Sequence, residues 1–188
     1  VATTEQHAYL DRARDGAKRL ETILVRLREA TGLEQAMRQA EPVDFDLAAL
    51  LRLQTSGLRT LYPNVDIHLS GADTSLPMRG VPDLLSQALD KLIDNAVDFH
   101  RAGSTIRIVC RRKDQTVYLT VQNEGKRLPE GVDIFQSMVS SRRSQQTEPH
   151  LGLGLFLVKL IAEFHGGRIT ATNQDTPEGV QLTLSLPQ

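Results

Sequence analysis

Small and apolar residues recur along the first part of the chain with the period of a helix. No proline lies between residues 4 and 37, and one row of positions advances by alternating steps of three and four, which is a heptad seam. A second row, spaced by seven, widens the apolar stripe beyond what a two-stranded coil buries and indicates a helical bundle. We therefore expect one long helix that self-associates or pairs with a segment upstream of Val1. The rows are Leu10, Ala13, Ala17, Leu20, Leu24, Leu27 and Thr31, and Tyr9, Gly16, Ile23, Ala30 and Met37.

The pattern changes at "EPVDFDL". Pro42 ends the long helix, residues 43–45 can form a short strand, and Asp46 can cap a new helix that runs to Leu61. We place a domain boundary here, with residues 1–40 as the long helix and residues 41–188 as a second domain.

Alternating and helical periods follow one another through the second domain. We expect a short strand in "YPNVDIHLSG", a helix that starts near Gly80 and Pro82, and a hairpin formed by "STIRIVCRR" and "QTVYLTVQN". A further helix over residues 154–164 ends at a glycine cap, and the strands "RITATN" and "VQLTLSLP" close the chain. This order predicts an α+β fold, a mixed and mostly antiparallel sheet covered on one face by three helices.

Composition narrows the classes of function. A formal net charge of -1 gives no support to non-specific nucleic-acid binding, which needs a surplus of Lys and Arg. The single cysteine, Cys110, excludes a disulfide framework, and its place in an apolar run predicts a buried, inert thiol in a reducing compartment. No apolar run is long enough to cross a bilayer. Because the sequence starts with Val1, we expect any membrane segment to lie outside it.

Three short segments carry candidate chemistry. In "DKLIDNAVDFH", Lys91 and Asn95 are one helical turn apart and point the same way from an otherwise apolar helix. "NEG", at residues 123–125, ends a predicted strand. "HLGLGLFLVKL" starts a helix with two glycines, where free N–H groups and the helix dipole favour an anion. Each segment also has a structural explanation: a solvated lysine with a locally bonded asparagine, a plain turn, and close packing of glycine.

The order and spacing of the three segments resemble the N, G1 and G2 boxes of the ATP-binding domain of bacterial sensor histidine kinases, a group that includes DNA gyrase B and the heat-shock chaperones. "IFQSM", between the second and third segments, resembles the F box of that family. The resemblance covers residues 43–187 and implies a Bergerat-type two-layer fold. The first helix is similar to the second helix of the kinase dimerisation hairpin, which implies a homodimer.

The resemblance implies a role for each matching residue. Asn95 would be the Mg²⁺ ligand, through its carbonyl oxygen, because Mg²⁺ prefers oxygen atoms. Lys91, where relatives often have Asn or Glu, would reach phosphate, and Phe99 would lie against the nucleotide. Residues 137–149 would form a lid whose cations, Arg142 and Arg143, face the phosphates. The residues expected to bind ATP with Mg²⁺ are Lys91, Asn95, Phe99, Asn123, Gly125, Arg142, Arg143, Gly152, Leu153, Gly154 and Leu155.

Four positions depart from the family pattern. Asn123 and Arg127 replace the adenine-reading carboxylate and the second glycine of the G1 box. Asp98 stands where a basic residue is usual, and His150 replaces a G2 glycine. An amide at position 123 can accept the adenine amino proton or turn and donate. We therefore expect ATP to bind with modest affinity and relaxed selectivity between adenine and guanine.

The sequence contains five histidines, and none is followed by the acidic residue and proline that mark the phosphoacceptor in the family. We expect the acceptor upstream of Val1, so that this chain binds nucleotide but does not label itself. The expected protein is the cytoplasmic portion of a kinase anchored in the inner membrane, with a response regulator as its partner. The alternative is a pseudokinase, a dimeric scaffold with a degenerate pocket. A gyrase-like clamp is disfavoured because it needs a glutamate where Lys91 stands.

Overall fold

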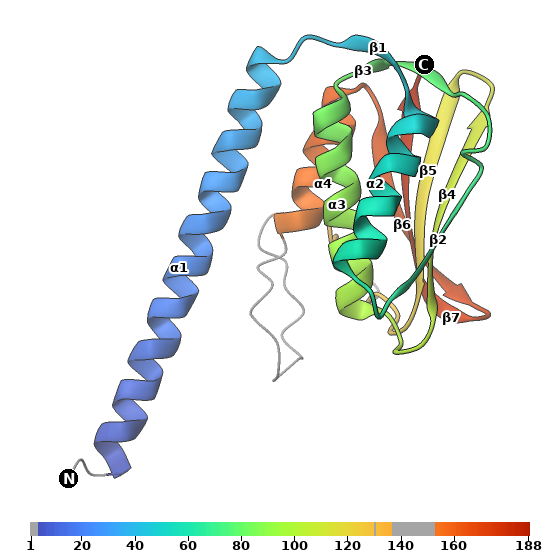
Figure 1. Cartoon of the computed structure of the whole chain (residues 1–188). Helices are drawn as coiled ribbons and strands as arrows, with labels where there is room; N and C mark the ends of the chain where they lie inside the picture. Colours follow the sequence, from blue (N-terminus) through green and yellow to red (C-terminus); the bar gives the residue numbers. More distant parts are fainter. Residues whose placement is uncertain (1–3, 130, 137–152) are drawn as a thin grey trace.

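The computed structural model describes residues 4–129, 131–136 and 153–188 (Figure 1). The long helix α1 (Thr4–Gln39) stands on one side of a layered body, and among the described residues it meets that body toward its C-terminal end. The helix that the heptad seam predicts is therefore present, although its apolar rows lie mostly outside the layered body. Tyr9, Leu10, Leu20 and Leu24 are all more than 60% exposed.

A five-stranded sheet with the order β2-β4-β5-β7-β6 forms one layer of the body. The strand β2 (Asp66–Ser70) runs parallel to β4 (Thr105–Lys113). The other pairings, among β4, β5 (Thr116–Glu124), β7 (Glu178–Pro187) and β6 (Arg168–Asp175), are antiparallel. The predicted mixed, mostly antiparallel sheet and both predicted hairpins are confirmed.

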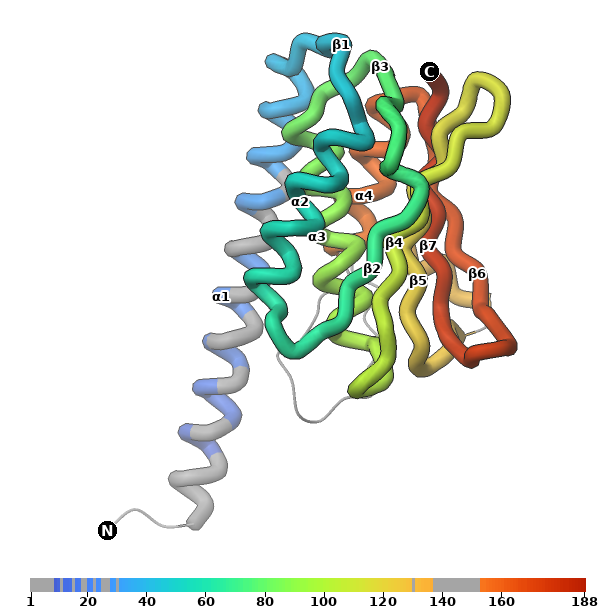
Figure 2. The backbone as a smooth tube through the Cα atoms, turned by 45° about the vertical axis from the view of Figure 1, so that its right-hand side comes forward, coloured from blue at the N-terminus to red at the C-terminus, as the bar shows by residue number. Residues whose placement is uncertain are grey.

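Three helices form the second layer and cover one face of this sheet (Figure 2). They are α2 (Leu47–Leu61), α3 (Pro82–Phe99) and α4 (Leu153–Phe164). The middle helix, α3, buries its apolar side in the core between the layers, with Leu89, Leu92 and Ile93 all fully buried. Because α3 is packed on several sides, the direction of its remaining polar positions is fixed.

Asp46 joins the start of α2 to a strand that the sequence pattern does not predict. Its carboxylate accepts hydrogen bonds from the N–H of Ala48, at 3.0 Å, and of Leu76, at 2.8 Å. These bonds, the one from Leu76 foremost, lower the pKa of Asp46. The predicted cap on α2 is confirmed. Leu76 leads into β3 (Pro77–Gly80), which pairs with β1 (Val43–Asp46). β3 alternates between exposed and buried positions, but its four residues are too few for the sequence pattern to mark a strand.

The thiol of Cys110 is 1% exposed, and burial raises its pKa to about 11. The interpretation as a buried, inert cysteine is confirmed.

His165, to which the sequence assigns no chemical role, fixes the start of α3 against the end of α4. Its Nε2 accepts a hydrogen bond from the N–H of Val81 at 3.0 Å, and its Nδ1 lies 2.8 Å from the carbonyl oxygen of Ile161. Val81 is the N-cap residue of α3 and has no side chain that can cap the helix. The imidazole thus contacts a carbonyl oxygen in α4 and accepts a hydrogen bond from the N-cap residue of α3.

We predict that His165→Phe lowers the free energy of unfolding by about 1–3 kcal/mol, because it keeps a ring in place but leaves the Val81 N–H without an acceptor. Urea unfolding followed by circular dichroism measures the change. His68→Phe, on an exposed position of β2, is the matched control and should shift stability by less than about 0.5 kcal/mol. Equal losses in the two variants would contradict a specific role for His165.

Candidate functional site

Two polar side chains that the sequence singles out lie side by side on α3. Lys91 and Asn95 are both half-buried and are one helical turn apart. Among the residues that the structure describes, none makes a hydrogen bond with the Asn95 amide. A half-buried amide of this kind has its carbonyl oxygen available to a ligand.

A second polar row on α3 consists of Asp90, Asp94 and Asp98, which are spaced by four residues. The hydroxyl of Tyr62, at the end of α2, donates to Asp94 at 2.8 Å. Burial raises the pKa of Tyr62 to about 12, and all three carboxylates add to the increase. Asp98 therefore shares the row of α3 that faces Tyr62. Its side chain is exposed at the C-terminal end of that row.

The end of β5 lies against α3. Asn123 is 4% exposed and continues the buried alternation of Val117, Leu119 and Val121, so its side chain faces the helical layer. The Asn123 Nδ2 donates a long hydrogen bond, 3.5 Å, to the carbonyl oxygen of Glu124. The Oδ1 atom is then the one left to accept a donor from a ligand.

Gly125, directly after β5, has a packing reason to be glycine. Its φ is +153°, and a Cβ atom built there would lie 2.2 Å from the carbonyl oxygen of Phe99. The backbone at the end of α3 makes an isolated bridge from His100 to Gly125, and Arg101 donates to the carbonyl oxygen of Glu124 at 2.6 Å. The resemblance implies close approach of ligand at Gly125, whereas the structure shows close approach of α3. The Phe99 side chain itself is 43% exposed.

Gly154, in the first turn of α4, is different. A Cβ atom built there would meet only the Cδ of Lys91, at 4.0 Å, which is ordinary contact. Packing within the described residues does not require a glycine here. Its neighbours Leu153 and Leu155 begin the helix with half-buried and buried side chains.

Several predicted residues lie outside the described part of the chain. They are Arg142, Arg143, His150 and Gly152, together with the predicted lid over residues 137–149.

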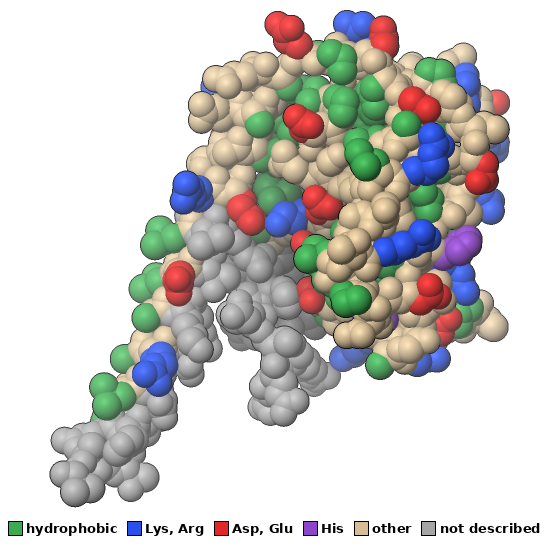
Figure 3. Space-filling view, in the orientation of Figure 1, with side chains coloured by type: hydrophobic (Ala, Val, Ile, Leu, Met, Phe, Trp, Pro, Cys, Tyr) green, Lys and Arg blue, Asp and Glu red, His purple; other side chains and the backbone are tan. Residues whose placement is uncertain are grey.

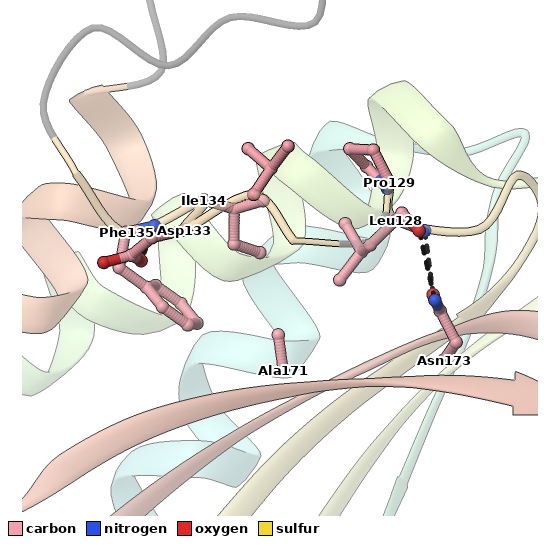
Figure 4. A pocket seen from close by; sticks show the side chains of 8 residues that line it. Leu128, Pro129, Asp133, Ile134, Phe135, Ala171 and Asn173 are labelled. Atoms are coloured by element: carbon pink, nitrogen blue, oxygen red, sulfur yellow. Dashed lines mark hydrogen bonds between the residues drawn. The ribbon is translucent and has the colours of Figure 1, made fainter.

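Residues 128–129 and 131–135, which include part of the "IFQSM" segment, lie over β6 (Figure 4). The side chain of Asn173 accepts from the N–H of Leu128 at 2.8 Å and donates to its carbonyl oxygen at 3.1 Å. Ile134 and Phe135 line a small cavity of about 210 Å³ between this segment and the strand. Arg127 forms an ion pair with Asp175 at the end of β6, so its guanidinium is engaged away from α3.

The described residues contain no group of three or more His, Cys, Asp or Glu side chains that could hold a metal ion. A Mg²⁺ ion beside Asn95 would therefore need oxygen atoms from its ligand and from water, as Mg²⁺ sites on phosphates commonly do. The free amide of Asn95 fits that arrangement.

Comparison with known proteins agrees with this geometry. Residues 80–188 match the profile of the family described as histidine kinase-, DNA gyrase B-, and HSP90-like ATPase. The chain is 33% identical over 120 residues to the heme sensor protein HssS of Staphylococcus haemolyticus, covering 64% of this chain and 26% of the relative. It is 31% identical over 146 residues to the sensor-type histidine kinase PrrB of Mycobacterium tuberculosis, covering 77% of this chain and 32% of the relative. The chain thus spans about a quarter to a third of the length of these relatives.

Solved structures give the same result. The ATP-binding domain of PrrB from Mycobacterium tuberculosis superposes with a TM-score of 0.62 at 26% identity, covering 79% of this chain and 98% of that domain. The histidine kinase ThkA, in complex with the response regulator protein TrrA, has the same fold, with a TM-score of 0.70 at 22% identity, covering 100% of this chain and 53% of that chain. None of the described helices of our chain is long and apolar enough to span a bilayer.

We expect alanine substitutions at Gly125 and Gly154 to have different effects on stability. Gly125→Ala should lower the free energy of unfolding by about 1–3 kcal/mol, because the new methyl group meets the Phe99 carbonyl in a backbone conformation that disfavours side chains. Gly154→Ala should leave stability unchanged or raise it by up to about 1 kcal/mol, since alanine is the better helix former. Thermal and urea unfolding of both variants measure these changes. A large loss in Gly154→Ala would mean that packing requires this glycine too.

Proposed function

Because the chain belongs to the family of histidine kinase-, DNA gyrase B-, and HSP90-like ATPases, we propose that it is the ATP-binding catalytic region of a two-component sensor kinase. The observation that carries the proposal is the row of Lys91 and Asn95 on α3, which lies beside Gly154 of α4, a glycine that packing against the described residues does not require. The whole kinase would transfer the γ-phosphoryl group of ATP to a histidine, for relay to a response-regulator aspartate.

Each part of the binding region has one task. Asn95 offers its amide oxygen to Mg²⁺, and the N–H groups at the start of α4 receive phosphate oxygens. Lys91 supplies positive charge beside them. The Oδ1 of Asn123 accepts a hydrogen bond from the amino group of the base, and Phe99 covers the nucleotide from the end of α3. The protein's contribution to phosphoryl transfer is largely such positioning and charge stabilisation.

The acceptor histidine is proposed to lie on another helix, which would pack beside α1 in a dimer. The exposed apolar side chains of Tyr9, Leu10, Leu20 and Leu24 support this pairing, because a stripe of this size is usually covered (Figure 3). A cytoplasmic location for this region, with an inner-membrane anchor elsewhere in the whole protein, is part of the same proposal.

The second candidate is a pseudokinase that binds nucleotide weakly or not at all. The pseudokinase is favoured by Asn123 in place of a carboxylate. Binding is favoured by the Asn95 amide, which bonds to no described residue, and by Gly154, which meets only the Lys91 stem among them. A titration with Mg-ATP separates the two candidates.

We predict that this chain binds Mg-ATP and that Asn95→Ala weakens the binding about tenfold or more, because the ion loses its protein ligand. Isothermal calorimetry with Mg²⁺ and with EDTA measures the effect, which should vanish in EDTA. Asn64→Ala, in the exposed turn before β2, is the matched control and should bind like the unchanged chain. A loss of equal size with and without Mg²⁺ would contradict the assignment of Asn95 as the metal ligand.

We also predict that Asn123→Asp raises the preference for ATP over GTP, because a carboxylate only accepts hydrogen bonds whereas an amide can also donate to guanine. One hydrogen bond of about 1–1.5 kcal/mol corresponds to a roughly five- to tenfold change in the ratio of dissociation constants. Calorimetry with both nucleotides gives that ratio, and circular dichroism checks that the buried carboxylate leaves the fold intact. If the ratio stays the same, position 123 does not read the base.

A further inference from the structure

Lys91 contacts a helix that lies outside the matched family region. Its Nζ is 3.4 Å from the Oε1 of Glu29 on α1, and the two side chains are 31% and 41% exposed. This ion pair links the long helix to the row of α3 that we assign to nucleotide. Acidic and basic side chains lie together where α1 meets the helical layer (Figure 3).

Two other carboxylates near Lys91 are engaged by α2. Asp90 accepts a hydrogen bond from the Nε2 of Gln54 at 2.7 Å, and Asp94 accepts one from the Tyr62 hydroxyl at 2.8 Å. Within the described residues, Glu29 is the ion-pair partner of Lys91. The position of α1 therefore decides whether the charge of Lys91 is neutralised.

The stem of Lys91 also runs past the first turn of α4. Its Cδ would be 4.0 Å from a Cβ atom at Gly154, and the ammonium group is two bonds farther along a flexible chain. The same ammonium can thus reach toward Glu29 or toward an anion at the start of α4. An anion held there would bring its charge close to the Glu29 carboxylate, and like charges at such distances repel.

The contact between α1 and the body is slight. Leu33, at 5% exposure, is the single buried side chain among those described on α1. An open groove of about 630 Å³, lined by Glu29, Gly32 and Leu33 on one side and by Lys91 and Leu157 on the other, separates the helix from the body. Among the described side chains of α1, buried Leu33 and partly buried Met37 pack on the apolar core, so the loss of one ion pair shifts how often α1 is docked.

We propose that Glu29 and the phosphates of a nucleotide compete for Lys91, so that docking of α1 and binding of nucleotide oppose each other. This inference rests on the proposed function, because it needs phosphate at the start of α4. The coupling is reciprocal: nucleotide releases α1, and a docked α1 weakens the affinity for nucleotide by the same factor. The ATP-binding domain is thereby freed from α1 when it is loaded.

The first test is a mutant cycle read by calorimetry with Mg-ATP. Glu29→Gln should tighten binding roughly two- to fivefold, the range expected for a partly exposed ion pair. Glu34→Gln is the matched control, because Glu34 lies on the same helix and pairs within it, with Arg38 at 2.7 Å. This control should leave the affinity unchanged.

The cycle also includes Lys91→Met, alone and combined with Glu29→Gln. In the Lys91→Met variant, Glu29→Gln should leave the affinity for Mg-ATP unchanged, because the ammonium group that pairs with Glu29 is absent. The proposal is overturned if Glu29→Gln leaves the affinity unchanged, or if it tightens binding equally without Lys91. If the chain without substitutions does not bind Mg-ATP at all, both the proposed function and this competition are overturned.

A second measurement follows α1 itself. Spin labels at exposed positions on α1 and β6, introduced as Arg14→Cys, outside the apolar rows of α1, and Thr172→Cys, report the distance between helix and body, while the buried Cys110 thiol stays unlabelled. Mg-ATP should lengthen and broaden the distance distribution, and Glu29→Gln should do so without nucleotide. A distribution that Mg-ATP leaves unchanged, in a chain shown by calorimetry to bind it, overturns the proposal while the proposed function stands.

Discussion

The arrangement of the candidate site depends on one close backbone approach, between the end of α3 and the end of β5. A Cβ atom at Gly125 would collide with the Phe99 carbonyl, and His100 forms an isolated bridge with Gly125. This contact fixes the height of α3 above the sheet. Asn123, at the end of β5, then lies at the same boundary between sheet and helices as the polar row of α3. A ligand that contacts both must span this boundary.

Polar side chains of α3 bond to two neighbouring helices, and one amide bonds to no described residue. Asp90 and Asp94 are bonded from α2, Lys91 reaches α1, and Asn95 makes no hydrogen bond with a described residue. One side of the helix is therefore structural and the adjacent side is available for a ligand. Asp98 continues the row of Asp90 and Asp94 at its exposed end, and its charge adds to the raised pKa of Tyr62.

The departures from the family pattern have separate explanations in the structure. Arg127 is engaged with Asp175, so it does not carry its charge toward α3. Lys91 brings a positive charge to α3, while Asp98 brings a negative one to another row. The sequence shows which residues these are, but the effect of their charges on the site depends on where their side chains point. His165 is the converse case, because its bonds to Val81 and Ile161 join segments that no local pattern relates.

By itself, the sequence determined the order and type of most helices and strands, the cap at Asp46 and the resemblance carried by Asn95, Gly125 and Gly154. These features depend on hydrophobic periodicity, capping residues and motif spacing, each of which can be read within one segment of the sequence. Only the tertiary structure decided that β3 pairs with β1, that Gly125 accommodates α3, and that Lys91 meets Glu29. Each of these is a contact between distant segments, and such contacts are set by how the layers pack rather than by any periodicity within one of them.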